Sequence, residues 1–217
     1  MAQIWVSLLG ADAMHYGKAI EGLMESGADS LHIDVFDGVY VRNLAFSPKI
    51  VSDIKAKYDV HVDVHLELFE PENYVEMFLD AGADALAYQA GTTQNNIRLL
   101  EKIRSYGAKA GLSLNPSTNF ADYQYLTDYI DYMIQLSVEP GFGNQMFQAQ
   151  ALEKIKNTSE LLHSLEADIP LGVDGSVNES NAAALKQAGV EIYIMGTAIT
   201  NAADQKAVVA SYKEMLQ

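Results

Sequence analysis

The chain has 217 residues, of which 49% are hydrophobic, so it is long enough to bury one substantial core. It contains no cysteine, which excludes disulfide bonds, thiolate metal ligands and cysteine nucleophiles. The formal net charge of −15, from 29 acidic and 14 basic residues, argues against nucleic acid or an anionic membrane surface as a partner. The charge does not exclude a small phosphorylated ligand, because backbone N–H groups at glycine turns can hold phosphate without a basic side chain.

The sequence shows no linker, no low-complexity tract and no apolar run of membrane-spanning length. Its first residues lack the basic region of a signal peptide. We therefore expect one domain over residues 1–217 in a soluble, cytoplasmic protein.

A junction between an amphipathic segment and a short apolar segment recurs along the chain. Glycine stands at each junction where a helix would end in a left-handed residue, at Gly27, Gly82, Gly107 and Gly189. The apolar segments predict strands near residues 4–9, 30–35, 60–66, 85–89, 108–114, 132–136, 170–174 and 192–196. Strands that alternate with helices in this way predict an α/β fold, a (β/α)8 TIM barrel. A doubly wound open sheet is the alternative, but the turn after the first strand lacks that fold's glycine-rich fingerprint.

Two of the predicted strands carry polar residues on one face. In the segment 31–38, His32 and Asp34 share a face and aliphatic residues occupy the other. The segment 60–67 repeats the pattern with His61, Asp63, His65 and Glu67. A buried imidazole beside a carboxylate is costly unless something binds them. The pattern predicts a metal or acid-base site inside the barrel, with His61 as a structural residue nearer its floor.

The active site of a barrel forms at the carboxyl ends of its strands. Polar residues stand at or after most of the predicted strand ends: Ser7, His32, Asp34, His65, Gln89, Asn115 and Asp174. Glycine-rich turns at 139–143, 175–176 and 196–197 follow the last three strands. Because barrels frequently bind phosphate in the loops after strands seven and eight, these turns predict a phosphate site.

Short stretches distributed over nearly the whole chain carry a family resemblance. They are SLL at 7–9, HIDVFDG at 32–38, NLAF at 43–46, DVHL at 63–66, GLSLNP at 111–116, SVEPGFG at 137–143, VDGS at 173–176 and GT at 196–197. In this combination and order they resemble the ribulose-phosphate 3-epimerase family. That resemblance implies a (β/α)8 barrel that epimerises a ketose phosphate at C3 through an enediolate, and it implies a homo-oligomer.

The resemblance also implies a ligand set and two catalytic groups. One divalent metal ion would be bound by His32, Asp34, His65 and Asp174, and nitrogen and oxygen ligands of this kind suit Zn²⁺, with Mn²⁺, Fe²⁺ and Co²⁺ as alternatives. Asp34 and Asp174 match the two carboxylates that transfer protons on opposite faces of the substrate.

The substrate implied by the resemblance is a small phosphorylated sugar. Ser7 matches a serine that contacts substrate, and His65 is expected to contact it as well. The residues that match the phosphate-binding turns are Gly141, Phe142, Gly143, Asn144, Gly175, Ser176, Gly196 and Thr197.

The chain departs from the family pattern around the substrate. Phe36, Glu67 and Leu136 stand where the family has methionines, and Gln89-Ala90-Gly91 stands for a His-x-Glu pair. The family also has proline, asparagine and glycine at Arg42, Glu139 and Asn144. The expected substrate is therefore ribulose 5-phosphate and xylulose 5-phosphate, or a related pentulose or hexulose phosphate.

Single motifs distinguish this chain from other functions of the same barrel. Related decarboxylases and hexulose-phosphate synthases carry an Asp-x-Lys-x-x-Asp strand, and residues 32–37 contain no lysine. A non-catalytic sugar-phosphate-binding protein is the alternative from another class, although binding alone would not need two acid-base carboxylates. Asp37 is expected to bind its own loop, Asp63 to orient His65 or another buried donor, and Glu67 to contact a substrate hydroxyl or to face solvent.

Overall fold

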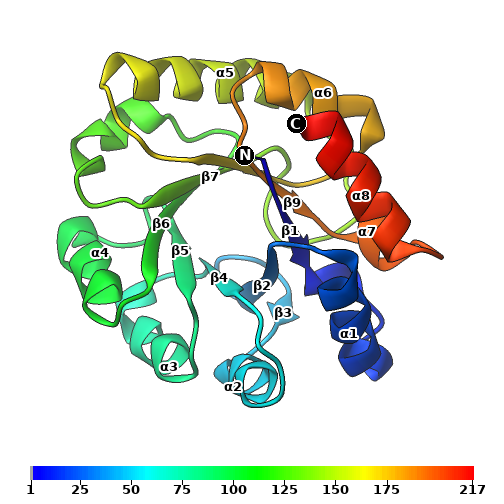
Figure 1. Ribbon diagram of the computed structural model, residues 1–217. Helices are drawn as coiled ribbons and strands as arrows, with labels where there is room; N and C mark the ends of the chain where they lie inside the picture. Colours follow the sequence, from blue (N-terminus) through cyan, green and yellow to red (C-terminus); the bar gives the residue numbers. More distant parts are fainter. Residues whose placement is uncertain (1) are drawn as a thin grey trace.

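The computed structural model describes residues 2–217 and shows a closed barrel of parallel strands inside a ring of helices (Figure 1). The barrel strands are β1 (Gln3–Ser7), β2 (Ser30–Asp37), β4 (Val62–Glu67), β5 (Ala85–Gln89), β6 (Lys109–Leu114), β7 (Tyr132–Leu136), β8 (Leu171–Asp174) and β9 (Ile192–Met195). They are hydrogen-bonded in the order β1-β9-β8-β7-β6-β5-β4-β2, and pairing of β1 with β2 closes the barrel. The predicted TIM barrel is confirmed.

Helices follow the strands and cover the outside of the barrel. They are α1 (Tyr16–Ser26), α2 (Pro48–Lys57), α3 (Val75–Asp80), α4 (Asn96–Ser105), α5 (Ala149–Ser164), α6 (Glu179–Gln187), α7 (Thr197–Thr200) and α8 (Gln205–Leu216). Short 3-10 helices are η1 (Leu8–Gly10), η2 (Ala13–His15), η3 (Pro71–Asn73) and η4 (Phe120–Leu126), the last of which replaces an α-helix after β6. None of the helices in the described part of the chain has the length and apolar character to cross a lipid bilayer.

The helix-to-strand junctions form as the glycine pattern predicts. Gly27, Gly82, Gly107 and Gly189 all have positive φ angles, between 82° and 99°. A side chain is strained in that conformation, so glycine lets each helix end and the chain enter the next strand.

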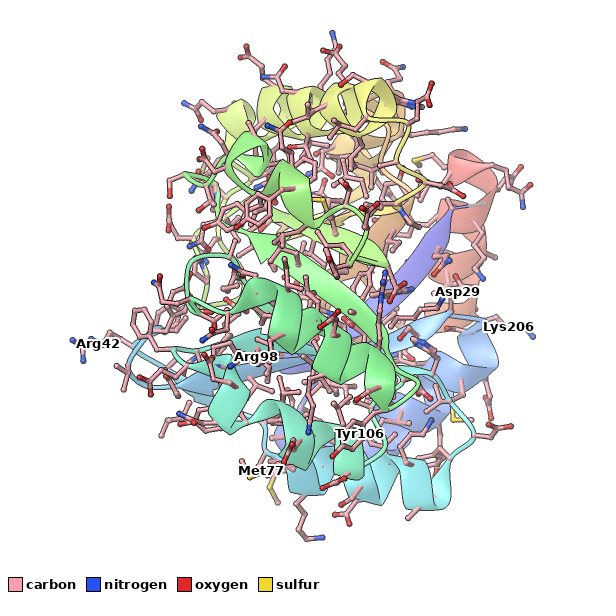
Figure 2. All side chains as sticks on the ribbon, turned by 90° about the vertical axis from the view of Figure 1, so that its left-hand side faces the viewer. Asp29, Arg42, Met77, Arg98, Tyr106 and Lys206 are labelled. Atoms are coloured by element: carbon pink, nitrogen blue, oxygen red, sulfur yellow. The ribbon has the colours of Figure 1, made fainter. Side chains whose placement is uncertain are left out.

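Alternation along the strands separates two environments. On β2 the aliphatic residues Leu31, Ile33 and Val35 are buried in the core between the strands and the helices. The inward face of the barrel holds a second apolar cluster, which includes Trp5, Tyr132 and residues of β5 and β9. Figure 2 views the barrel from the side, with Arg42 of the loop after β2 at one end and Asp29, which precedes β2, towards the other.

Two details of the strands differ from the sequence prediction. The first strand, expected over 4–9, ends at Ser7, because the Ser7 hydroxyl accepts a hydrogen bond from Leu9 N at 3.2 Å and starts η1. A short strand β3 (Leu44–Ala45), which the sequence did not predict, pairs antiparallel with the end of β2.

Candidate metal centre and active site

Four predicted metal ligands from three strands converge at the carboxyl end of the barrel. His32 and Asp34 lie on β2, His65 on β4 and Asp174 at the end of β8. One ligand atom from each residue lies within 4.8 Å of all the others. The register of the strands brings two of these residues together, because Asp34 on β2 pairs with His65 on the neighbouring strand β4. Strand alternation and register therefore assemble this cluster.

His32 is held from both sides by carboxylates. Its Nδ1 lies 2.6 Å from Asp63 Oδ2 and its Nε2 lies 3.1 Å from Asp34 Oδ1, and all three residues are buried. Burial alone would lower the pKa of His32, but the charges and hydrogen bonds of Asp34 and Asp63 outweigh it and raise that pKa well above its ordinary value. When Nδ1–H donates to Asp63, Nε2 is the nitrogen turned towards the cluster.

Asp63 thus orients a histidine, as the sequence predicted, and the histidine is His32. The phenol of Tyr132 on β7 donates a hydrogen bond to Asp63 Oδ1. Its ring fits because Gly111 is its register partner on β6, where a Cβ would overlap the ring. Tyr132 was not predicted from the sequence, where its only signal is its place on an inward strand face.

The two predicted acid-base carboxylates lie in unlike electrostatic surroundings. Burial would raise the pKa of Asp34, but His32 and His65 outweigh it and lower that pKa well below the ordinary value. The Ser7 hydroxyl also donates a hydrogen bond of 2.6 Å to Asp34 Oδ2. For Asp174, burial and the charge of Asp34 raise the pKa to about 6. The pKa values of the two carboxylates are therefore shifted in opposite directions.

A cavity of about 510 Å³ opens at this end of the barrel above the cluster. His32 and His65 lie fully buried below the cavity. The other predicted site residues all line it, namely Ser7, Asp34, Gly141, Phe142, Gly143, Asn144, Asp174, Gly175, Ser176, Gly196 and Thr197. The cavity therefore joins the acidic cluster to the glycine turns.

The turn after β7 is bonded to the loop after β2 and to the turn after β9. Asn43 Nδ2 donates to Gly141 O at 2.8 Å, and Thr197 Oγ1 donates to Asn144 Oδ1 at 3.3 Å. Gly141 and Gly175 have φ angles of 114° and 106°, which glycine adopts without strain. The turns after β7, β8 and β9 thus form one wall of the cavity.

Two acidic residues near the cavity play different parts. Asp37 binds its own loop as predicted, because its Oδ1 accepts hydrogen bonds from Val39 N and Tyr40 N, each at 2.8 Å. Glu67 lines the cavity and is only 2% exposed, so it does not face bulk solvent.

The cluster has the donor set of a site for a divalent cation. Two imidazole nitrogens and two carboxylate oxygens suit Zn²⁺ and other first-row divalent ions. His65 Nδ1 is buried without a hydrogen-bond partner and lies 3.7 Å from Asp34 Oδ1. Because a buried nitrogen is costly when unpaired, this atom is a ready ligand. The cluster is able to bind a metal ion.

Comparison with known proteins identifies the family of the chain. Residues 3–200 match the model of the ribulose-phosphate 3 epimerase family. The ribulose-phosphate 3-epimerase of Bacillus subtilis (strain 168) is 34% identical over 98% of this chain and 99% of its own length. The enzyme of that name from Helicobacter pylori (strain J99 / ATCC 700824) is 36% identical over 97% of this chain and 96% of its own.

A solved structure supports the fold independently. The KGPDC of Streptococcus mutans superimposes with a TM-score of 0.76 over 100% of this chain and 97% of its own, at 12% identity. At that identity the likeness concerns the barrel alone. The family model and the two relatives carry the assignment further: the chain belongs to the ribulose-phosphate 3-epimerase family and is an isomerase that epimerises carbohydrates.

Proposed function

We propose that the chain epimerises a ketose phosphate at C3 with the help of one divalent metal ion. The substrate is ribulose 5-phosphate and its epimer xylulose 5-phosphate, or a related pentulose or hexulose phosphate. One observation carries the proposal. Two carboxylates from β2 and β8 meet two histidines at the base of a cavity, one wall of which consists of glycine turns.

The two carboxylates serve as the acid and the base. Asp34 and Asp174 come from strands that β1 and β9 separate, so they can face a substrate carbon from different sides. One removes the C3 proton and the other returns a proton to the far face, which inverts the configuration. The Ser7 hydroxyl, which donates to Asp34 Oδ2, holds that carboxylate in place and lines the substrate cavity.

A cation held by His32, Asp34, His65 and Asp174 would supply positive charge that stabilises the substrate oxygens once the C3 proton leaves. Zn²⁺ is the proposed ion, with Mn²⁺, Fe²⁺ and Co²⁺ as alternatives, because all accept nitrogen and oxygen ligands. The hydrogen bond between His32 and Asp63 keeps one ligand nitrogen directed at that position.

The glycine turns bind the phosphate in this proposal. No lysine or arginine lines the cavity in the described part of the chain, so backbone N–H groups are the available donors. The turn residues of the site are Gly141, Phe142, Gly143, Asn144, Gly175, Ser176, Gly196 and Thr197. His65 lies below the cavity, and in this proposal it contacts the substrate from the side on which the cation is bound.

We also propose that the chain forms a homo-oligomer. Large apolar side chains stand exposed in the segments after β2 and β7, where Val39, Leu44 of β3 and Met146 are 64%, 76% and 88% exposed. Exposed apolar side chains of this size are available for contact with a second subunit.

Incubation of metal-loaded protein with pentulose and hexulose phosphates should interconvert the C3 epimers of at least one of them, as read by NMR. Free ribulose should react far more slowly than ribulose 5-phosphate, because it lacks the group that the turns bind. Tight binding of a sugar phosphate without interconversion would instead identify a non-catalytic binding protein. Equal rates with free ribulose would show that the glycine turns do not bind the phosphate.

A further inference from the structure

Glu67 is a buried carboxyl group that the reaction described above does not use. It lies at the carboxyl end of β4, lines the cavity and is only 2% exposed. Its Oε1 lies 3.6 Å from His65 Nδ1, and its Oε2 has no hydrogen-bond partner. Among the buried side-chain atoms of residues 2–217 that lack a partner, Glu67 Oε2 alone belongs to a residue lining the cavity. Such an atom is costly unless a ligand satisfies it.

The barrel places Glu67 opposite the phosphate turns. In the closed strand order, β4 stands four strands from β8 in either direction. Asp174 ends β8 and Gly175 follows it, so the cavity runs from the phosphate turns, across the carboxylates, to Glu67. Phe36, the register partner of Glu67 on β2, is apolar and buried, and so is Leu136 on β7, which also lines the cavity. Glu67 is thus the polar group at the end of the cavity farthest from the phosphate turns.

We propose that Glu67 is a specificity-determining residue that binds the C1 hydroxyl of a 2-ketose phosphate. This inference rests on the proposed function, which puts the phosphate at the glycine turns and C3 between Asp34 and Asp174. The phosphate and the C1 hydroxyl lie at opposite ends of such a sugar, so the C1 end extends towards β4. The hydroxyl donates to Glu67 Oε2, and the site rejects ketose phosphates that lack it.

The test compares xylulose 5-phosphate with 1-deoxyxylulose 5-phosphate by calorimetric titration of the metal-loaded protein. The wild type should bind the hydroxylated sugar roughly 10- to 100-fold more tightly, because the sugar without the hydroxyl leaves a buried hydrogen-bonding group of Glu67 unsatisfied. Glu67→Met should reduce that ratio towards one, whereas Glu67→Gln, which keeps an acceptor oxygen, should retain most of it. Leu136→Met is the matched control, because it changes another residue of the same cavity and keeps Glu67. It should leave the ratio of the two sugar affinities unchanged.

Three results would overturn the inference. They are an unchanged ratio in Glu67→Met, a wild type that binds both sugars equally or neither, and a loss of metal affinity in Glu67→Met that weakens both sugars alike. The last would make Glu67 a metal ligand. Failure of the proposed function looks different, because the wild type would then prefer the hydroxylated sugar without interconverting the epimers.

A second inference comes from the contact between Gln89 and His65. Gln89 Nε2 lies 3.1 Å from His65 Nε2, while Gln89 Oε1 and His65 Nδ1 are both buried without partners. If the amide N–H donates to Nε2, the imidazole proton must sit on Nδ1, and a protonated Nδ1 cannot bind a cation. A half turn of the amide brings Oε1 to Nε2–H instead and leaves Nδ1 free.

We infer that Gln89 is a positioning residue that fixes the metal-binding tautomer of His65. Its Oε1 accepts the hydrogen bond from His65 Nε2–H. Ser113, the register partner of Gln89 on β6, has a buried hydroxyl without a partner and offers an acceptor for the turned amide. Both buried atoms that lack a partner are then used: Gln89 Oε1 accepts the hydrogen bond, and His65 Nδ1 binds the cation.

Gln89→Met should weaken metal binding by roughly 10- to 100-fold, the usual loss for a residue that orients a ligand. Gln89→Glu keeps an acceptor oxygen and should restore the affinity. Competition with a chelator measures the affinity, and ¹⁵N NMR of the metal-free protein reports the His65 tautomer. The matched control is Gln135→Met on β7, because Gln135 is equally buried but bonds backbone carbonyl groups. Wild-type affinity in Gln89→Met, or an equal loss in Gln135→Met, would refute the positioning role.

Discussion

Asp34→Asn and Asp174→Asn should each stop net epimerisation, because each carboxylate serves one face of C3. Loss of a general acid-base group typically costs ~10²–10⁴-fold in rate, and the loss here should reach at least that range because both residues are also proposed ligands. Each variant should still exchange the C3 proton of the one epimer whose proton faces the remaining carboxylate. The two variants should therefore show opposite preferences when exchange in D₂O is followed by NMR.

Asp37→Asn provides the matched control for these carboxylates. Asp37 lies on the same strand as Asp34, but its carboxylate binds the backbone of its own loop. Its substitution should leave the stereochemical pattern of exchange unchanged. If either Asp34→Asn or Asp174→Asn interconverts the epimers at nearly the wild-type rate, the two-base mechanism is wrong.

His32→Ala and His65→Ala should each lower the metal content of the purified protein and remove most turnover. Each replacement deletes a nitrogen ligand, so the loss of affinity should exceed the roughly 10- to 100-fold typical of residues that only orient a ligand. Elemental analysis after dialysis against a weak chelator measures the bound ion.

His61→Ala is the control for the two histidines. His61 precedes β4 and is exposed, and its Nδ1 contacts the Ser30 hydroxyl at 2.8 Å, away from the cluster. That variant should hold as much metal as the wild type. Full metal occupancy in both His32→Ala and His65→Ala would contradict the ligand assignment.

Much of the fold could be predicted because its signals are local. A glycine that ends a helix and an aliphatic alternation that makes a strand each lie within a few residues, and Gly27 and Gly189 behave as their neighbours predict. The end of β1 depends on one side chain, since Ser7 turns back to Leu9 N and starts a 3-10 helix. A serine after an apolar run does not reveal that choice by itself.

The site divides in the same way between local and distant information. Alternation along one strand predicts that His32 and Asp34 share a face. The contacts of Asp63 with His32 and Tyr132 depend instead on the register of three strands, and the sequence of one strand carries no register. Burial of Glu67 likewise depends on which residues stand opposite it in the closed barrel.

Deuterium incorporation at C3 is the most direct test of whether Asp34 and Asp174 transfer protons to and from C3. Metal-loaded wild-type protein in D₂O should place deuterium at C3 of both epimers while it interconverts them, and C1 should keep its protons. Interconversion without deuterium at C3, or deuterium at C1 alone, would contradict C3 epimerisation by two carboxylates.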